Sequence, residues 1–314
     1  MVTVRNINPP KGFPNRHESR EILYFSLQNT NGLEAVIMNW GARLLKVNMP
    51  DKQGKRGNVV LAYPSLDGYL HDDSEIGSLL VARYVNRIRN HQFIDPASKQ
   101  PIELVQNWLT HTLHSDYPAG RWSNRFWEVK DVGKNYVELG LVSGDSDQRF
   151  PGQVDITMEL SLTDDNRLIQ MTAARVSGKT TPLNIGGHVY WNFEDYSTRN
   201  VQSHIIETNA AHFLEVDKEL IPTGKVLLVQ ESPYLNFLTP KRIGDDAKNI
   251  DNCLVFPRAK GTFGSVRVYS PYSGRGAVMS TNEPCSQFYV ADHMGDPPFL
   301  KWGELQLNSM GQLI

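Results

Sequence analysis

The stretch VDITMELSLTDDNRLIQMTAARV, residues 154–176, carries the clearest period-two alternation in the chain. Its first part, residues 154–162, alternates apolar and polar side chains, which is the pattern of a strand with one buried face. Turn-forming residues follow at 163–166, and residues 168–176 return to strand-type composition. The stretch therefore predicts an antiparallel hairpin whose first strand buries Val154, Ile156, Met158, Leu160 and Leu162.

Strand-type segments recur on both sides of this hairpin. We expect further strands at residues 34–49, 58–62, 136–142, 201–208 and 265–269, and short helices only at 65–70, with Ser65 as N-cap, and at 75–85. Short strands between Gly, Pro, Asn and Asp turns are typical of an all-β sandwich or barrel. No linker, repeat or block of charge divides the sequence, so we expect a single domain over residues 1–314.

Charge and composition argue against several classes of partner. The chain has 32 Lys and Arg against 34 Asp and Glu, a formal charge of -2, so it lacks the basic excess that binding to nucleic acid requires. It has no apolar run long enough to span a membrane, and residues 1–20 contain no hydrophobic signal core. Its two cysteines, Cys253 and Cys285, favour a reducing compartment. We therefore expect a cytoplasmic protein without a nucleic-acid or membrane partner, and nothing in the sequence indicates an oligomeric state.

Motifs for cofactor chemistry are missing from the sequence. It contains no P-loop, no G-x-G-x-x-G, no G-x-S-x-G and no H-E-x-x-H, so nucleotide, serine-hydrolase and zinc-protease chemistry lose support. The segment THTLHSD (110–116) offers His111, His114 and Asp116 as metal ligands, but strand spacing sends the two histidines to opposite faces. We expect neither a metal nor another cofactor.

Two segments carry candidate acid–base groups. If TPLNIGGHVYWNF (181–193) forms one strand, His188 lies on its polar face, and an imidazole with a pKa of about 6.5 suits proton transfer near neutral pH. A solvent-facing histidine on an ordinary strand is the other interpretation. In GELQLN (303–308), Glu304 is either a catalytic base or a solvated surface carboxylate. The polar face of the first segment holds Asn184, His188, Tyr190 and Asn192, and its apolar face Leu183, Ile185, Val189, Trp191 and Phe193.

Other side chains fit a sugar ligand. Arg87, in VARYVNRIRNHQF (81–93), presents a rigid fork of donors that can bind vicinal hydroxyls, although such a run of arginines is also typical of a solvated face. CSQFYVADH (285–293) directs Gln287 and Tyr289 to one face, either toward a ligand or as hydrogen-bonding groups at the edge of the core. Four aromatic side chains could form flat apolar walls for a sugar or could equally belong to the core. They are Trp122, Trp127, Tyr190 and Trp191.

Taken in order, these segments resemble the aldose 1-epimerase (galactose mutarotase) family, and the likeness runs from about residue 31 to residue 308. NGLEAVIMNWGARLLKVNMPDKQGK (31–55) and NVVLAYPSLDGYL (58–70) resemble the N-terminal strands of that family and the turn after them. The resemblance implies a large antiparallel β-sandwich of the galactose mutarotase type, with a few short helices and a cleft for a sugar. It also implies an isomerase that needs no metal or nucleotide.

The resemblance assigns roles to individual residues. VARYVNRIRNHQF is similar to the family's N-R-I segment and makes Arg87 a substrate-binding residue. LHSDYPAGRWSNRFW resembles the L-H-G-G segment and makes His114 the first active-site histidine. PLNIGGHVYWNF resembles the N-H-x-Y-F-N strand and makes His188 the general acid.

Three further assignments come from the C-terminal part of the chain. IDNCLVF (250–256) resembles the D-H-N strand and implies a ligand of sugar hydroxyls at Asp251, and EPCSQFYVADH places the family's glutamine at Gln287. GELQLN resembles the L-E-x-Q segment and places the catalytic base at Glu304.

The chain departs from the family pattern at three places. Ser115 and Asp116 replace the glycine pair after the first histidine, and Gly187 replaces the asparagine that usually precedes the second, which points to an altered specificity. Ten residues follow Glu304 where family members usually continue, so the chain is either naturally short or truncated.

The resemblance implies the interconversion of α and β anomers of a free aldose. Glu304 would remove the proton of the C1 hydroxyl while His188 protonates the ring oxygen, and reclosure of the open aldehyde after rotation would give the other anomer. Two alternatives stay open. One is a non-catalytic sugar-binding or regulatory protein on the same fold, and the other is a glycosidase that uses Asp251 and Glu304 but leaves His188 without a role.

Overall fold

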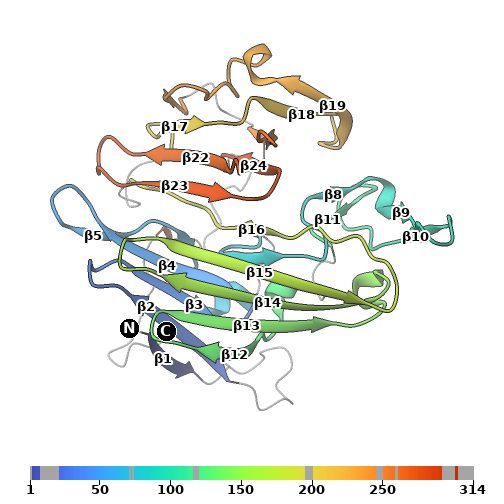
Figure 1. The fold of residues 1–314 in the computed structure, drawn as a ribbon, viewed down its shortest axis with the longest axis horizontal. Helices are drawn as coiled ribbons and strands as arrows, with labels where there is room; N and C mark the ends of the chain where they lie inside the picture. Colours follow the sequence, from blue (N-terminus) through green and yellow to red (C-terminus); the bar gives the residue numbers. More distant parts are fainter. Residues whose placement is uncertain are drawn as a thin grey trace. The chain divides into compact units, whose positions relative to one another are not determined.

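The computed structural model describes residues 2–7, 21–70, 72, 74–115, 120–194, 201–244, 250–258, 261–291 and 301–302 (Figure 1). The chain forms two compact units. The first unit comprises Met1–Met49, Asn58–Trp191 and Pro298–Ile314, and the second comprises Pro50–Gly57 and Asn192–Pro297. The expectation of a single domain over residues 1–314 stays a prediction. No helix among the described residues is long and apolar enough to cross a membrane.

A seven-stranded sheet in the order β1-β2-β3-β4-β7-β16, with β5 paired to β4, is the larger sheet of the first unit. Its strands alternate buried apolar positions with less buried ones, as in Ile22–Gln28 and Glu34–Met38. The strands are β1 (Val2–Ile7), β2 (Ile22–Gln28), β3 (Glu34–Met38), β4 (Arg43–Pro50), β5 (Arg56–Asn58), β7 (Ser78–Val81) and β16 (Gly186–His188).

The predicted hairpin lies in the second sheet of the first unit, in the order β12-β13-β14-β15. In β14 (Gln153–Leu162) every second residue is buried, beginning with Val154, and β15 (Leu168–Ser177) pairs with it in register from Leu162 and Leu168. The turn is closed by the N–H of Asn166, which donates to the carbonyl oxygen of Thr163 over 3.2 Å. The hairpin prediction is therefore confirmed. The other strands of this sheet are β12 (Glu128–Val132) and β13 (Tyr136–Ser143).

Short elements of the first unit position the residues of the candidate site. Strand β8 (Arg87–Ile88) pairs with β11 (Thr112–Leu113), β9 (Gln92–Ile94) with β10 (Pro101–Glu103), and β6 (Leu61–Ala62) with β25 (Lys301–Trp302). The helical elements are α1 (Leu66–Leu70) and the 3-10 turns η1 (Arg89–His91), η2 (Trp122–Asn124) and η3 (Asp147–Arg149).

The second unit contains two four-stranded antiparallel sheets around an apolar core. Their orders are β20-β17-β22-β23 and β19-β18-β21-β24. Phe213, Phe237, Leu254 and Phe256 belong to the buried cluster of this unit. The elements are β17 (Ile205–Thr208), β18 (His212–Val216), β19 (Pro222–Leu228), η4 (Val229–Glu231), β20 (Lys241–Arg242), β21 (Asp251–Val255), β22 (Gly264–Tyr269), β23 (Gly276–Thr281) and β24 (Cys285–Tyr289).

Several predicted elements are wrong in kind or extent: the strands expected at 58–62 and 201–208 are shorter, at Leu61–Ala62 and Ile205–Thr208. Residues 34–49 form two strands, because the chain turns at Gly41, whose φ is +72° and where a Cβ would lie 2.0 Å from the carbonyl oxygen of Ser123. The helix predicted at 75–85 is instead β7, which is buried along its whole length between β4 and β16. Pairing on both edges satisfies its backbone groups, and this tertiary context overrides the local pattern.

Candidate active site

Two predicted catalytic residues of the first unit lie side by side. His114 directly follows β11, His188 ends β16, and their ring centroids are 5.0 Å apart in an edge-to-face arrangement. The ring centroid of Tyr190 is 5.2 Å from the ring centroid of His188. Elements distant in the sequence thus bring together two proton-transfer groups and a phenol.

The orientation of the His114 ring is fixed by the backbone beside Arg87. The ring Nδ1 accepts a 3.0 Å hydrogen bond from the backbone N–H of Asn86, and the backbone N–H of His114 donates to the carbonyl oxygen of Asn86 over 3.1 Å. Because Nδ1 is an acceptor, the neutral ring carries its proton on Nε2. Ser115, one of the departures from the family pattern, accepts a 2.7 Å bond at Oγ from the N–H of Tyr84. The serine therefore fastens the loop that carries His114 to the strand segment before Arg87.

Arg87 lies at the same place in the fold, because it pairs with Leu113 in the β8–β11 ladder. Its guanidinium carbon is 4.5 Å from the ring centroid of Trp108, and Nη1 donates a 3.1 Å hydrogen bond to Oδ1 of Asn86. Trp108 thus forms a flat support under the guanidinium. The sequence analysis missed Trp108, since no spacing pattern separates this tryptophan from those of the core.

A buried network of charges stands near His188. Glu75 is 2% exposed, accepts a 3.1 Å hydrogen bond from Oγ of Ser78 and forms an ion pair with Nε of Arg121 at 3.1 Å. Asp72 is equally enclosed and pairs with Nη1 of Arg43 at 2.5 Å. The sequence analysis missed these residues as well, because a carboxylate in a polar segment carries no local signal that it will be buried.

Desolvation and charge set the protonation of the histidine pair. Removal from water holds the pKa of His114 well below its usual range, and the positive charges of His188, Arg121 and Arg87 act in the same direction. Removal from water also lowers the pKa of His188, while the carboxylates of Glu75 and Asp72 oppose this change. Removal from water therefore favours the neutral form of both rings.

The prediction of one continuous strand over residues 181–193 is wrong. Only Gly186–His188 pairs with β7, with a register shift inside it, and single bridges then join Asn184 to Tyr84 and Trp191 to Val60. Trp191 is 40% exposed although it was assigned to the apolar face, and Asn192 is 2% exposed although it was assigned to the polar one. The alternation fails because the segment changes its pairing partner along its length.

Asp251 and Gln287, the two predicted hydroxyl ligands, meet in the second unit. They lie on the paired strands β21 and β24, and Nε2 of Gln287 donates a 2.6 Å hydrogen bond to Oδ1 of Asp251. Glu304, the predicted base, lies outside the described residues, as does Asp116.

The two histidines of the considered metal site each use Nδ1 as an acceptor for a backbone N–H. In His111 this nitrogen accepts a 2.9 Å bond from the N–H of Asn90. Among the described residues, no group of three or more His, Cys, Asp and Glu is arranged to hold a metal ion.

Two tryptophans considered as walls for a sugar, and one arginine considered as part of a solvated face, belong to the core instead. Trp122 and Trp127 are each 1% exposed, and Nε1 of Trp127 donates to the carbonyl oxygen of Trp122 over 3.1 Å. Arg83 is fully buried and donates to the carbonyl oxygen of Ser143 over 2.8 Å, so it is not part of a solvated basic face.

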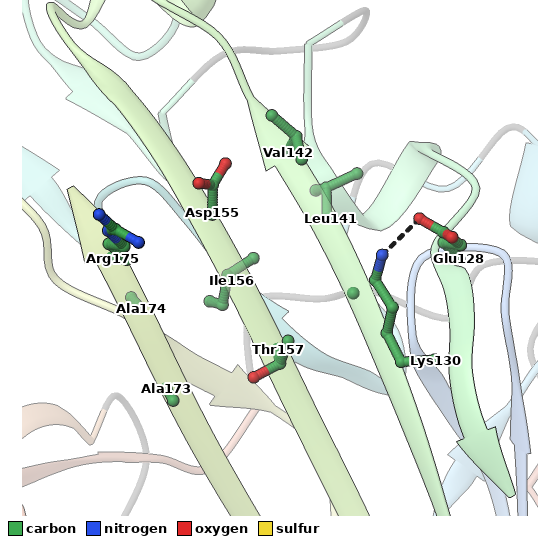
Figure 2. A pocket seen from close by; sticks show the side chains of 11 residues that line it. Glu128, Lys130, Leu141, Val142, Asp155, Ile156, Thr157, Ala173, Ala174 and Arg175 are labelled. Atoms are coloured by element: carbon green, nitrogen blue, oxygen red, sulfur yellow. Dashed lines mark hydrogen bonds and ion pairs between the residues drawn. The ribbon is translucent and has the colours of Figure 1, made fainter. Parts of the chain in front are cut away.

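A hollow of about 520 Å³ on the β12–β15 sheet lies apart from these residues (Figure 2). It is lined by three consecutive residues from each of β13, β14 and β15, among them Thr157 and Arg175, and at one side by the 2.6 Å ion pair of Lys130 with Glu128. None of the predicted site residues lines it.

Fold and site together define an antiparallel all-β protein in which two histidine rings are in contact. The sequence profile of the aldose 1-epimerase family matches residues 24–311. The chain belongs to the aldose 1-epimerase family, which confirms the predicted family and its class of enzyme, an isomerase.

Individual relatives agree with this assignment. The chain is 30% identical to an aldose 1-epimerase of Haemophilus influenzae over 99% of this chain and 88% of that protein. It is 28% identical to a galactose mutarotase of Bos taurus over 86% of this chain and 78% of that protein.

Solved structures share the fold. A GalM/aldose epimerase homologue from C. elegans superposes with a TM-score of 0.79 at 27% identity, covering 87% of this chain and 82% of that one. A galactose 1-epimerase from Lactobacillus acidophilus superposes with a TM-score of 0.78 at 18% identity, covering 97% and 90%. The predicted fold class, an antiparallel β-sandwich of the galactose mutarotase type, is confirmed.

Proposed function

We propose that the chain is a mutarotase that interconverts the α and β anomers of a free aldose by opening and reclosing the sugar ring. The observation that carries the proposal is the edge-to-face pair of His114 and His188 in a member of the aldose 1-epimerase family. Both alternatives from the sequence are weaker, because a sugar-binding protein does not need the proton-transfer pair of His188 and Glu304, and a glycosidase leaves His188 without a role.

In the proposed reaction, His188 is the acid and Glu304 the base. Glu304 removes the proton of the C1 hydroxyl while the imidazolium of His188 protonates the ring oxygen, and the roles reverse after rotation about C1–C2. The lowered pKa of His188 makes its imidazolium a stronger acid than that of free histidine, although less of it is present at pH 7. Glu75 and Asp72 partly restore the charged form, which fits the function of a proton donor.

His114 and Arg87 are proposed to hold the ring oxygen. The Nδ1 atom of His114 is occupied by the Asn86 N–H, so its Nε2–H is the donor that the ring can direct to a sugar. Arg87 rests on Trp108, which limits the positions that its guanidinium can adopt.

Asp251 and Gln287 are proposed to bind sugar hydroxyls, and their mutual hydrogen bond orients both groups. The proposal requires no metal or nucleotide, because proton transfer alone opens and closes the ring. A cytoplasmic location is part of the same proposal, supported by two cysteines that are both free.

Anomer-exchange NMR on a panel of freshly dissolved aldoses tests the function and identifies the sugar. We expect wild-type protein to accelerate exchange equally with and without EDTA. Glu304→Gln and His188→Asn should each lower kcat by roughly a hundred- to ten-thousand-fold, the usual contribution of one proton-transfer group, while sugar binding survives. His212→Asn, at an exposed histidine of the second unit, is the matched control and should retain full activity.

The same measurements separate the alternatives. A wild-type protein that binds sugar without accelerating exchange would make the chain a sugar-binding protein. Full activity in Glu304→Gln would remove the proposed base, and loss of activity in EDTA that zinc restores would require a metal mechanism.

A further inference from the structure

The two cysteines of the chain lie on one face of a single strand pair in the second unit. In the antiparallel ladder of β21 and β24, Cys253 is opposite Gln287 and Cys285 is opposite Val255. Directly opposed residues share a face, so the two cysteines are diagonal neighbours on that face. The intervening residues of β21, Asn252 and Leu254, point to the core, and the cysteine face is therefore the more exposed one.

A second diagonal in the same ladder shows that such neighbours touch here. Asp251 is opposite Tyr289, yet its carboxylate contacts the amide of Gln287, two residues away along β24, at 2.6 Å. The Cys253–Cys285 diagonal is the next one along the ladder and runs in the same direction. Both side chains of this second diagonal are shorter, and both are free thiols.

The two thiols differ in acidity. The neighbouring Cys253 lowers the pKa of Cys285 to about 7, whereas the neighbouring Cys285 and burial raise the pKa of Cys253. Arg258 adds to the lowering and Glu283 opposes it. Cys285 is exposed while Cys253 is half-buried. Cys285 is thus the more accessible and more acidic thiol, which reacts first, and Cys253 is the adjacent resolving thiol.

We propose that Cys253 and Cys285 form an oxidisable thiol pair that closes a cross-strand disulfide when the protein meets hydrogen peroxide. The Cys285 thiolate attacks one peroxide oxygen and the O–O bond breaks, which leaves a sulfenic acid on Cys285 and releases hydroxide. The Cys253 sulfur then attacks the sulfenic sulfur, the S–S bond forms and water leaves. Two thiols and one peroxide become one disulfide and two waters, and the thiols supply both electrons.

Closure of this diagonal changes the ladder beside it. Diagonal neighbours in an antiparallel pair have Cα atoms about 7–8 Å apart, whereas disulfides span about 4.4–6.8 Å, so β21 and β24 must approach each other. Asp251 and Gln287 occupy the adjoining diagonal and shift with the strands. The expectation that oxidation weakens sugar binding rests on the proposed function of these two residues.

Mass spectrometry of the full-length protein tests the disulfide without any activity assay. After treatment with hydrogen peroxide and alkylation, we expect wild-type protein to lose the mass of two hydrogens, to yield one cross-linked pair of peptides holding Cys253 and Cys285, and to regain both thiols with a dithiol reductant. Cys253→Ser should stop at a sulfenic acid on Cys285 that a dimedone probe traps. Cys285→Ser should leave Cys253 reduced under the same treatment.

The proposal is overturned if wild-type Cys285 accumulates as sulfenic or sulfinic acid without the cross-link, or if the disulfide joins two chains. Both serine variants lie on the exposed face of the ladder and should fold, and circular dichroism checks that they do.

Sugar affinity, measured by calorimetry on reduced and oxidised wild-type protein, tests the consequence. We expect about a tenfold weaker Kd after oxidation, equivalent to one lost hydrogen bond to a charged group, and recovery on reduction. Cys285→Ser should bind sugar equally before and after peroxide. An intact disulfide with unchanged affinity would contradict the coupling to Asp251, whereas a reduced protein that neither binds sugar nor accelerates exchange would contradict the proposed function and leave the disulfide standing.

Discussion

Glu75 acts on His188 through charge and not through contact with a substrate. Its carboxylate is buried, is held by Ser78 and Arg121, and opposes the desolvation that lowers the pKa of His188. Such a countercharge favours the protonated ring, whereas removal from water favours the neutral one. Glu75 is in this sense a positioning residue for the proton of His188.

Replacing this carboxylate should therefore change the titration of the histidine. In Glu75→Gln we expect the pKa of His188 to fall further, because the opposing charge is gone while desolvation and the charge of Arg121 remain. The chemical shift of the His188 ring, followed by NMR as a function of pH, measures the change.

Glu34→Gln is the matched control. Glu34 is also a partly buried, ion-paired carboxylate, with Nζ of Lys46 at 3.0 Å, but it does not act on His188. An unchanged His188 titration in Glu75→Gln, or an equal change in both variants, would rule out the electrostatic role.

At the scale of elements, the hairpin of β14 and β15 shows how well alternation predicts burial. Met158 and Ile156 are at most 2% exposed, while Thr157 between them is only partly buried and is one of the residues drawn at the hollow in Figure 2. The same rule failed for residues 181–193, where the paired segment is short and the pairing partner changes. Periodicity needs several residues against one partner before it becomes a reliable signal.

Removal of side-chain atoms on the buried face of β14 should lower the stability of the fold. We expect Met158→Ala to lower the free energy of unfolding by about 2–5 kcal/mol, because the missing atoms leave a cavity in a closely packed core. Thr157→Val keeps the β-branched shape on the open face and should stay within about 0.5 kcal/mol of wild type. Urea denaturation of both variants measures the difference, and equal stabilities would mean that β14 does not bury this face in solution.

At the scale of the whole molecule, the two compact units raise the question of cooperativity. The first unit contains the histidine pair, and the second contains Asp251 and Gln287. Each unit has its own apolar core, with Met158 in one and Phe237 in the other. A single-domain protein nevertheless unfolds as one cooperative body.

Differential scanning calorimetry tests the expectation of one domain. We expect one transition whose Tm falls both in Met158→Ala and in Phe237→Ala, the latter because loss of a buried phenylalanine costs about 3–5 kcal/mol. The exposed substitutions Thr157→Val and Tyr272→Phe serve as controls in the two units. Two transitions, each shifted by only one of the core variants, would show that the units unfold separately.

The sequence by itself determined the class of fold, the family and the identity of the two histidines. Period-two alternation is a local pattern and can be recognised from the sequence alone. The short motifs around Arg87, His114 and His188 can likewise be recognised by their similarity to the motifs of the family. Only the tertiary structure decided that the rings of His114 and His188 meet, that Trp108 supports Arg87, and that the carboxylates of Glu75 and Asp72 act on His188. These relations join elements far apart along the chain, and their strength depends on burial, which no local pattern encodes.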